Sequence, residues 1–216
     1  MKWWLRTVQI FLDTCDIAAV AKAQGSGLIE GVTTSYSRII GLGRNPRDVY
    51  RELIVMGIPH ISAEVLGDAT CIVRDAHGLI ETFDNKLTIK VPCTKDGLMA
   101  CRELKKEGAE VNVTLVFSAA QSILAAKTGA DYVTVPVGMC DSNSVAGLEV
   151  VRSVVELCAR ANRSAFKGQT KVMADCIHDV YKVTRAFYNG ADIVSMPPDI
   201  FEKMYDHVLT REGLLQ

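Results

Sequence analysis

A lysine stands in the middle of the apolar run 87–92, which reads Leu-Thr-Ile-Lys-Val-Pro. An ammonium group without a partner is costly to bury, and enzymes that bury a lysine often use its amine to form a Schiff base with a carbonyl substrate. The alternative is an edge strand whose lysine faces solvent, since lysine is common on exposed strand faces. The residues expected around Lys90 distinguish these two interpretations.

Other residues that suit Schiff-base chemistry stand at or near the ends of other apolar runs. Asp13 and Glu64 offer carboxylates for proton transfer, and Thr114 offers a hydroxyl that could hold a water molecule. An amine nucleophile, carboxylates and small hydroxyls form the set of groups that such an enzyme needs. Further polar residues follow the same pattern at the ends of runs: Thr33, Thr34, Ser35, Asn112, Asp175, Cys176 and His178.

The cysteines indicate neither a metal centre nor a disulfide framework. Their number, seven, is odd, and they are scattered along the chain without a Cys-x-x-Cys pair or a Cys/His cluster of zinc spacing. We therefore expect no bound metal, and free thiols that favour a reducing compartment, the cytoplasm.

Short apolar runs alternate with amphipathic stretches along the whole chain. Strands are expected at 8–13, 28–33, 60–65, 87–92, 111–116, 131–136, 171–175 and 192–196. Helices are expected at 16–24, 46–56, 69–81, 95–106, 118–127, 145–162, 179–188 and 199–206. Gly108, Gly129 and Gly190 each follow a helical pattern, where a helix-ending glycine belongs.

About eight strand–helix units in one chain predict a single-domain (β/α)8 barrel over residues 1–216. A doubly wound open sheet is the alternative, but no Gly-x-Gly-x-x-Gly follows the first strand. Thr88 and Lys90 share one face of their strand, and Ile89 and Val91 share the other. If Ile89 and Val91 pack under the helices, Lys90 points into the barrel, where chemistry gathers at the carboxyl ends of the strands.

Composition limits the partners of the protein. The net charge is -1, from 24 basic and 25 acidic residues, which gives no reason to expect a nucleic acid or an acidic membrane surface. No segment approaches the roughly 20 apolar residues of a membrane span. Met1 to Leu5 could begin a signal peptide, but Asp13 and Asp16 interrupt the apolar stretch, so we expect none.

The motifs, taken in order, resemble the small transaldolases, a family that includes fructose-6-phosphate aldolase. The matching stretches cover most of the chain: 11–14 (Phe-Leu-Asp-Thr), 31–34 (Gly-Val-Thr-Thr), 62–65 (Ser-Ala-Glu-Val), 89–92 (Ile-Lys-Val-Pro) with Thr94 and 97–98 (Gly-Leu), 112–118 (Asn-Val-Thr-Leu-Val-Phe-Ser) with 120–121 (Ala-Gln), 129–130 (Gly-Ala) and 132–133 (Tyr-Val).

This resemblance implies a (β/α)8 barrel that uses neither metal nor cofactor and cleaves, forms or transfers a dihydroxyacetone unit through a lysine imine. Lys90 would form the imine with a ketose or small hydroxyketone, Asp13 and Glu64 would assist proton transfer, and Thr114 would position a water. Glu64 and the run 115–118 favour the transaldolase branch over the aldolase branch. The family also implies carbohydrate metabolism of the pentose phosphate type and a homo-oligomer based on a pentameric ring.

The departures from the family concentrate in the substrate site. Ser35 and Tyr36 replace the usual Asn-Pro after the second strand, and Met139 replaces an arginine that helps to bind the substrate phosphate. Cys176 and His178 replace a serine and a basic residue after the seventh strand. The resemblance therefore assigns substrate binding to a set that this chain has partly rewritten: Thr33, Ser35, Asn112, Ser118, Met139, Cys176 and His178.

The rewritten set lacks permanent cations, because methionine donates no hydrogen bond and a histidine side chain is mostly uncharged at neutral pH. Charge-assisted contacts to phosphate contribute roughly 1.5–3 kcal/mol each, so a phosphorylated sugar is disfavoured. We expect a changed substrate, including the possibility of an aldolase-type lyase that acts on a non-phosphorylated sugar or ketone. Alternatively, Arg38, Arg44 or Lys167 compensates from a loop.

A non-catalytic, sugar-binding paralogue is the remaining alternative. Against it, Lys90, Asp13, Glu64 and Thr114 are all retained together. At the chain ends, residues 1–7 form an expected extension. Family members continue past the equivalent of 209–214 into a helix that packs on a neighbouring subunit, and we expect that exchange helix to be truncated here.

Overall fold

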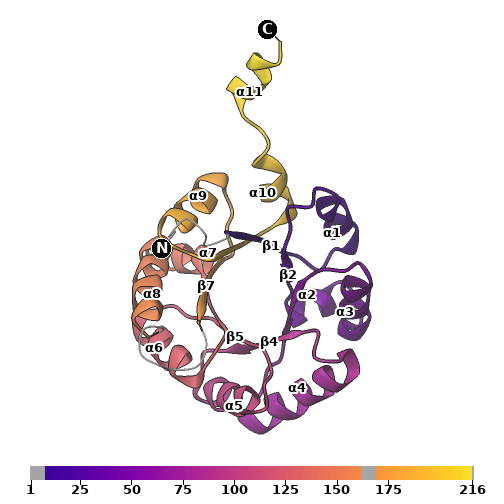
Figure 1. Cartoon of the computed structure of the whole chain (residues 1–216), viewed down its shortest axis with the longest axis vertical. Helices are drawn as coiled ribbons and strands as arrows, with labels where there is room; N and C mark the ends of the chain where they lie inside the picture. The colour runs from indigo at the N-terminus through magenta and orange to yellow at the C-terminus, as the bar shows by residue number, and fades with distance from the viewer. Residues whose placement is uncertain (1–7, 162–168, 216) are drawn as a thin grey trace.

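Eight parallel strands close into one barrel in sequence order, with β1 paired to β8 as well as to β2 (Figure 1). The computed structural model describes residues 8–161 and 169–215, so the expected extension 1–7 and Lys167 lie outside the described residues. The strands are β1 (Gln9–Asp13), β2 (Gly31–Thr33), β3 (His60–Glu64), β4 (Thr88–Pro92), β5 (Val111–Thr114), β6 (Tyr132–Pro136), β7 (Lys171–Asp175) and β8 (Ile193–Met196). The closed barrel confirms the (β/α)8 prediction and excludes the open sheet.

Helices surround the barrel, and all eight predicted helices are present with ends shifted by a few residues. They are α1 (Ile17–Gln24), α3 (Pro46–Val55), α4 (Ala69–Phe83), α5 (Lys95–Lys106), α6 (Ala119–Thr128), α8 (Gly147–Ala161), α9 (Val180–Tyr188) and α10 (Pro198–Lys203). Most begin with a side chain that accepts a hydrogen bond from the first turn, as Thr94 does for α5 and Asp68 for α4.

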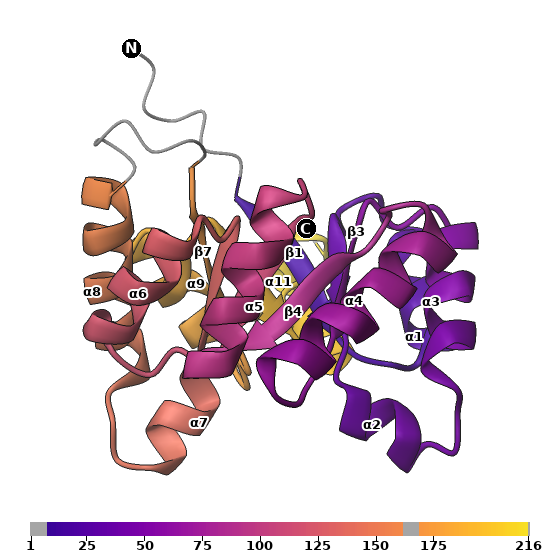
Figure 2. The same cartoon turned by 90° about the horizontal axis from the view of Figure 1, so that it is seen from below.

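Three short helices are not predicted by the sequence: α2 (Tyr36–Gly41), α7 (Val137–Ser142) and α11 (Val208–Gly213). Six residues are too few to establish a helical period, and Ser35 and Pro136 make no side-chain cap for α2 and α7. Both α2 and α7 extend beyond the barrel at the same end, at the bottom of the view in Figure 2. These two helices therefore flank the carboxyl ends of the strands.

The segment 141–144, which leads into α8, is partly helical. Asp141 and Ser142 belong to α7, and Asn143 ends it. The Asp141 carboxylate still accepts a hydrogen bond from the Gly147 N–H at 2.9 Å, so it stabilises the start of α8 from within the preceding helix.

The barrel interior and the layer under the helices are packed separately. Ile89 and Val91 are fully buried in the large core between strands and helices, which leaves Lys90 on the inner face of β4. Inside the barrel, Phe11 packs with three other apolar side chains, and its ring fills the space that a side chain at Gly31 would need. Phe11 and Gly31 are direct partners in the β1–β2 register, so glycine is the residue that makes room for this ring.

The C-terminal helix α11 projects away from the barrel and buries none of its residues (Figure 1). The expected truncation of an exchange helix stays a prediction. No helix in the described part of the chain has the length and apolar character needed to cross a bilayer.

Gly97 lies where helix α5 approaches the end of β4 closely enough to exclude a side chain. A Cβ atom at Gly97, in the first turn of α5, would overlap the carbonyl oxygen of Pro92, whereas a Cβ atom at Gly41 meets nothing within 4 Å. We expect Gly97→Ala to lower the free energy of unfolding by roughly 2–4 kcal/mol, and Gly41→Ala to change it by less than about 0.5 kcal/mol. Urea denaturation followed by circular dichroism measures both, and equal stabilities would contradict the close approach of α5.

Candidate active site at the carboxyl end of the barrel

Lys90 lies inside the barrel and is only 7% exposed. Its strand is paired on both sides, with β3 and with β5, so the solvated edge-strand alternative is wrong. The Nζ atom donates a hydrogen bond to the Thr34 carbonyl oxygen at 2.6 Å and lies 3.5 Å from Oε1 of Glu64. The ammonium group is therefore buried with a dipole and an opposite charge beside it.

Glu64 connects the lysine to the short helix α2. It is the direct register partner of Lys90 across β3 and β4, and its side chain is 14% exposed. While Oε1 faces Lys90, Oε2 accepts a hydrogen bond from the Tyr36 N–H at 3.1 Å. The carboxylate thus sits at the start of α2, where helix N–H groups favour negative charge.

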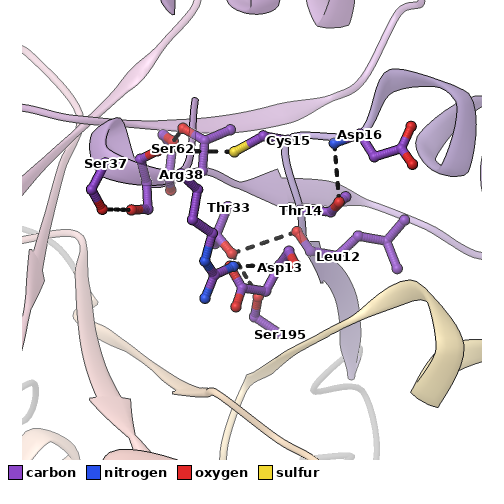
Figure 3. Close-up of polar contacts among 12 residues, drawn as sticks. Leu12, Asp13, Thr14, Cys15, Asp16, Thr33, Ser37, Arg38, Ser62 and Ser195 are labelled. Carbon is purple, nitrogen blue, oxygen red and sulfur yellow. Dashed lines mark hydrogen bonds and ion pairs between the residues drawn. The ribbon is translucent and has the colours of Figure 1, made fainter. Parts of the chain in front are cut away.

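Asp13 ends β1 and pairs with an arginine that reaches inward from α2. Its Oδ1 lies 2.6 Å from a terminal nitrogen of Arg38, which also donates to the Asp13 carbonyl at 3.5 Å. Figure 3 shows the Arg38 side chain extended toward Asp13. Of the loop cations considered as phosphate ligands, Arg38 does reach the site, but it is engaged by Asp13, and Arg44 is engaged by Glu52.

Asp175 at the end of β7 brings a further carboxylate to the same place. It is 8% exposed, and one donor atom from each of Asp13, Asp175 and Cys176 lies within 4.8 Å of the other two. Burial and then the neighbouring charge of Asp13 raise the pKa of Asp175 to about 6, against the opposing influence of Lys90. Its Oδ1 has no hydrogen-bond partner in the described parts of the chain.

Cys176 turns the chain sharply after β7. Its φ of 56° lies in the left-handed region, and its carbonyl oxygen accepts a hydrogen bond from the Gly138 N–H at 3.1 Å. Burial, followed by the charges of Asp175 and Asp13, raises the pKa of its thiol to about 12, so the sulfur keeps its proton. A protonated thiol and a carboxylate already paired with Arg38 make this cluster a poor site for a metal cation.

The inner faces of β5 and β2 carry the predicted hydroxyl and amide groups. Thr114 is 4% exposed at the end of β5. Asn112 is the register partner of Lys90 and is fully buried. Its Oδ1 accepts a hydrogen bond from Thr134 at 2.7 Å, and its Nδ2 donates to no partner within the residues described. Thr33 shares a hydrogen bond of 2.7 Å with Ser195 of β8.

Four predicted substrate residues lie further out or have local partners. The Ser35 hydroxyl bonds to Ser37 at 2.9 Å, and the Ser118 hydroxyl caps α6 by accepting from the Gln121 N–H at 3.3 Å. Met139 in α7 is 44% exposed. His178 is exposed, and its ring covers Gly138, where a Cβ atom would approach it to 2.7 Å.

Two features of the site are missing from the sequence-based prediction: the pairing of Arg38, expected only as a phosphate ligand, with Asp13, and the presence of Ser195. Arg38 lies on a helix too short to be recognised from its pattern, so its direction could not be inferred. Ser195 shares a hydrogen bond with Thr33 and lies close enough to the Asp175 carboxylate to offset part of the rise in its pKa. Ser195 could have been found from the sequence, because it lies two residues after Ile193 in β8 and both side chains face the inside of the barrel.

The charge of Asp175 should destabilise the folded protein. Because its pKa rises from 3.8 to about 6 on folding, the folded state binds this proton more tightly, and stability is lost as the pH rises through that interval. Asp175→Asn cannot ionise at this position and so avoids this loss. The difference in free energy of unfolding between Asp175→Asn and the wild type should therefore shift in favour of the variant by up to about 3 kcal/mol between pH 4 and pH 8. Urea titrations of both proteins across that range provide the measurement, and a constant difference would contradict the raised pKa.

Comparisons with known proteins agree with the geometry. The family model described as "Transaldolase/Fructose-6-phosphate aldolase" matches residues 10–215. A "Probable transaldolase" of Paracoccus denitrificans is 38% identical over 97% of this chain and 94% of that protein, and one of Phenylobacterium zucineum is 37% identical over the same shares. A thiamine phosphate pyrophosphorylase from Pyrococcus furiosus shares the fold alone, with a TM-score of 0.55 at 16% identity over 88% of this chain and 86% of that one. The chain therefore belongs to the transaldolase/fructose-6-phosphate aldolase family.

Proposed function

We propose that the protein is a class I enzyme that forms an imine between Lys90 and a ketose or small hydroxyketone, and then cleaves, forms or transfers at a carbon–carbon bond. The observation that carries this proposal is the burial of the Lys90 amine between the Thr34 carbonyl and the Glu64 carboxylate. A lysine held this way is shielded from water, directed into the barrel and next to a group that can accept its proton.

The first half of the reaction forms the imine. Glu64 takes a proton from the Lys90 ammonium, and the free amine attacks the ketone carbon to give a carbinolamine. The carbinolamine hydroxyl leaves as water after it receives a proton, which Glu64 can return directly or through a water held by Thr114. The products are a protonated imine and one water molecule.

The second half uses the imine as an electron sink. Asp13 accepts the proton of the substrate hydroxyl beyond the bond to be broken, the carbon–carbon bond breaks, and its electron pair enters the imine to give an enamine and a free aldehyde. Addition of the enamine to another aldehyde gives transfer, and protonation followed by hydrolysis gives cleavage. We favour transfer, because the relatives are named probable transaldolases.

Two further features support the wider proposal. All seven cysteines are free thiols, which fits the reducing cytoplasm. The helix α11 and the residues that follow it leave Leu209, Leu214 and other apolar side chains exposed, which fits a homo-oligomer in which this segment contacts another subunit.

Imine formation can be tested by chemical trapping. Borohydride reduction in the presence of dihydroxyacetone should attach the reduced ketone to Lys90, as identified by peptide mass spectrometry. Lys90→Met should abolish the adduct, and Lys95→Met, an exposed lysine in the first turn of α5, should leave it unchanged. The absence of an adduct with dihydroxyacetone, hydroxyacetone and fructose in the wild type would favour the non-catalytic paralogue.

The proton-transfer roles proposed for Glu64 and Asp13 predict that removing either base slows the reaction while Lys90 is still present. Glu64→Gln and Asp13→Asn keep the size of each side chain and remove the base, so we expect each to slow its step by about a hundredfold or more. For Glu64→Gln the step is imine formation, followed by rapid-quench borohydride trapping. For Asp13→Asn it is release of aldehyde from fructose. Glu81→Gln on the exposed face of α4 is the control. An unchanged rate in either variant would assign that transfer to another group.

A further inference from the structure

We propose that Asp175 determines substrate specificity: its unpartnered carboxylate oxygen accepts a hydrogen bond from a hydroxyl of an uncharged hydroxyketone and excludes a phosphate from the same position. This inference rests on the proposed function, because Lys90 must hold the ketone as an imine. It adds a residue to which the family resemblance assigned no role.

The first observation is an unsatisfied pair of polar atoms in the barrel interior. Oδ1 of Asp175 is a buried acceptor and Nδ2 of Asn112 is a buried donor, and neither has a hydrogen-bond partner in the part of the chain described here. Buried polar atoms without partners are costly, and they mark places where a ligand supplies the missing bonds. A hydroxyketone has hydroxyl groups that both donate and accept, so it can satisfy both atoms.

The second observation is the position of Asp175 relative to the amine. Lys90 acts electrostatically on Asp175, and Asn112 is the register partner of Lys90 on β5. Asp175 also lies against Asp13, the carboxylate assigned to the cleavage step. A ketone bonded to Lys90 therefore has its neighbouring hydroxyls between the acceptor on β7 and the donor on β5.

The third observation is that the nearby cations are already engaged. Arg38, which experiences the charge of Asp175, is paired with Asp13 at 2.6 Å, and Lys90, the amine that binds the ketone, lies 3.5 Å from Glu64. A phosphate at this position would meet the Asp175 carboxylate without an uncommitted cation from the described residues. Repulsion and desolvation would both oppose it, whereas a hydroxyl would gain a charge-assisted hydrogen bond.

The test compares three ketones by borohydride trapping on Lys90 at about pH 8, where Asp175 is ionised. Dihydroxyacetone carries two hydroxyls, hydroxyacetone lacks one of them, and dihydroxyacetone phosphate replaces one with an anion. Half-saturating concentrations are measured for the wild type, Asp175→Ala, Asp175→Asn and the control Asp75→Asn on the outer helix α4, whose carboxylate is half exposed. Circular dichroism confirms that each variant is folded.

We expect the wild type to bind dihydroxyacetone about tenfold or more tightly than either of the other ketones, since a charge-assisted hydrogen bond carries that much discrimination. Both preferences should fall to within about twofold in Asp175→Ala, because the acceptor and the charge are both lost. Asp175→Asn should lose the discrimination against phosphate and keep part of the preference for the second hydroxyl, since its amide oxygen still accepts. Asp75→Asn should match the wild type.

The outcomes separate this inference from the proposed function. Adducts in every variant with unchanged preferences would overturn the role of Asp175 and leave the imine mechanism intact. Tighter trapping of dihydroxyacetone phosphate than of dihydroxyacetone in the wild type would overturn it as well, and would assign Arg38 to anion binding. A wild type that forms no adduct with any of the three ketones would overturn the proposed function itself.

Discussion

The burial of one ammonium group organises the carboxyl end of this barrel. Lys90 is 7% exposed, and its charge is accepted by the Thr34 carbonyl and the Glu64 carboxylate. Both partners are fixed in turn: the Thr34 hydroxyl donates to the Ser62 carbonyl at 2.9 Å, and Glu64 accepts from the Tyr36 N–H. The chain after β2 must therefore turn at once into α2, because the N–H that holds Glu64 belongs to the first residue of that helix.

The same helix supplies the charge that balances the other side of the site. Arg38, two residues along α2 from Tyr36, neutralises Asp13, so Asp13 can remain buried as a carboxylate beside Asp175. Among the described residues Asp175 has no cation of its own within hydrogen-bond distance, and burial and the charge of Asp13 dominate its pKa. The ionised Asp175 carboxylate therefore destabilises the folded protein. Selection for stability alone would not retain a buried charge of this kind.

The strands, the long helices and the inward direction of Lys90 could be predicted from the sequence, because they depend on local periodicity and on parity along one strand. Ile89 and Val91 are buried as that parity requires. The engagement of Arg38 could not be predicted, since it depends on a six-residue helix without a capping side chain and on a contact between distant segments. Asp175 was visible at the end of its strand, but its missing hydrogen-bond partner is a property of the surrounding packing and leaves no trace in the sequence.

Buried polar groups have hydrogen-bond partners at one end of the barrel and lack some of them toward the other end. This difference distinguishes polar groups that stabilise the fold from those that suit a ligand. At the amino end, the His60 ring bonds to Ser62 at 2.9 Å and packs between the rings of Phe11 and Tyr132, and burial lowers its pKa to about 4, so it remains neutral within a closed network. Toward the carboxyl end, the donor of Asn112 and the acceptor of Asp175 have no protein partners in the described chain. Buried atoms without partners are tolerated where a ligand supplies the missing hydrogen bonds. Family resemblance locates the lysine, but the atoms that the protein leaves unpaired are the better indication of which molecule reaches it.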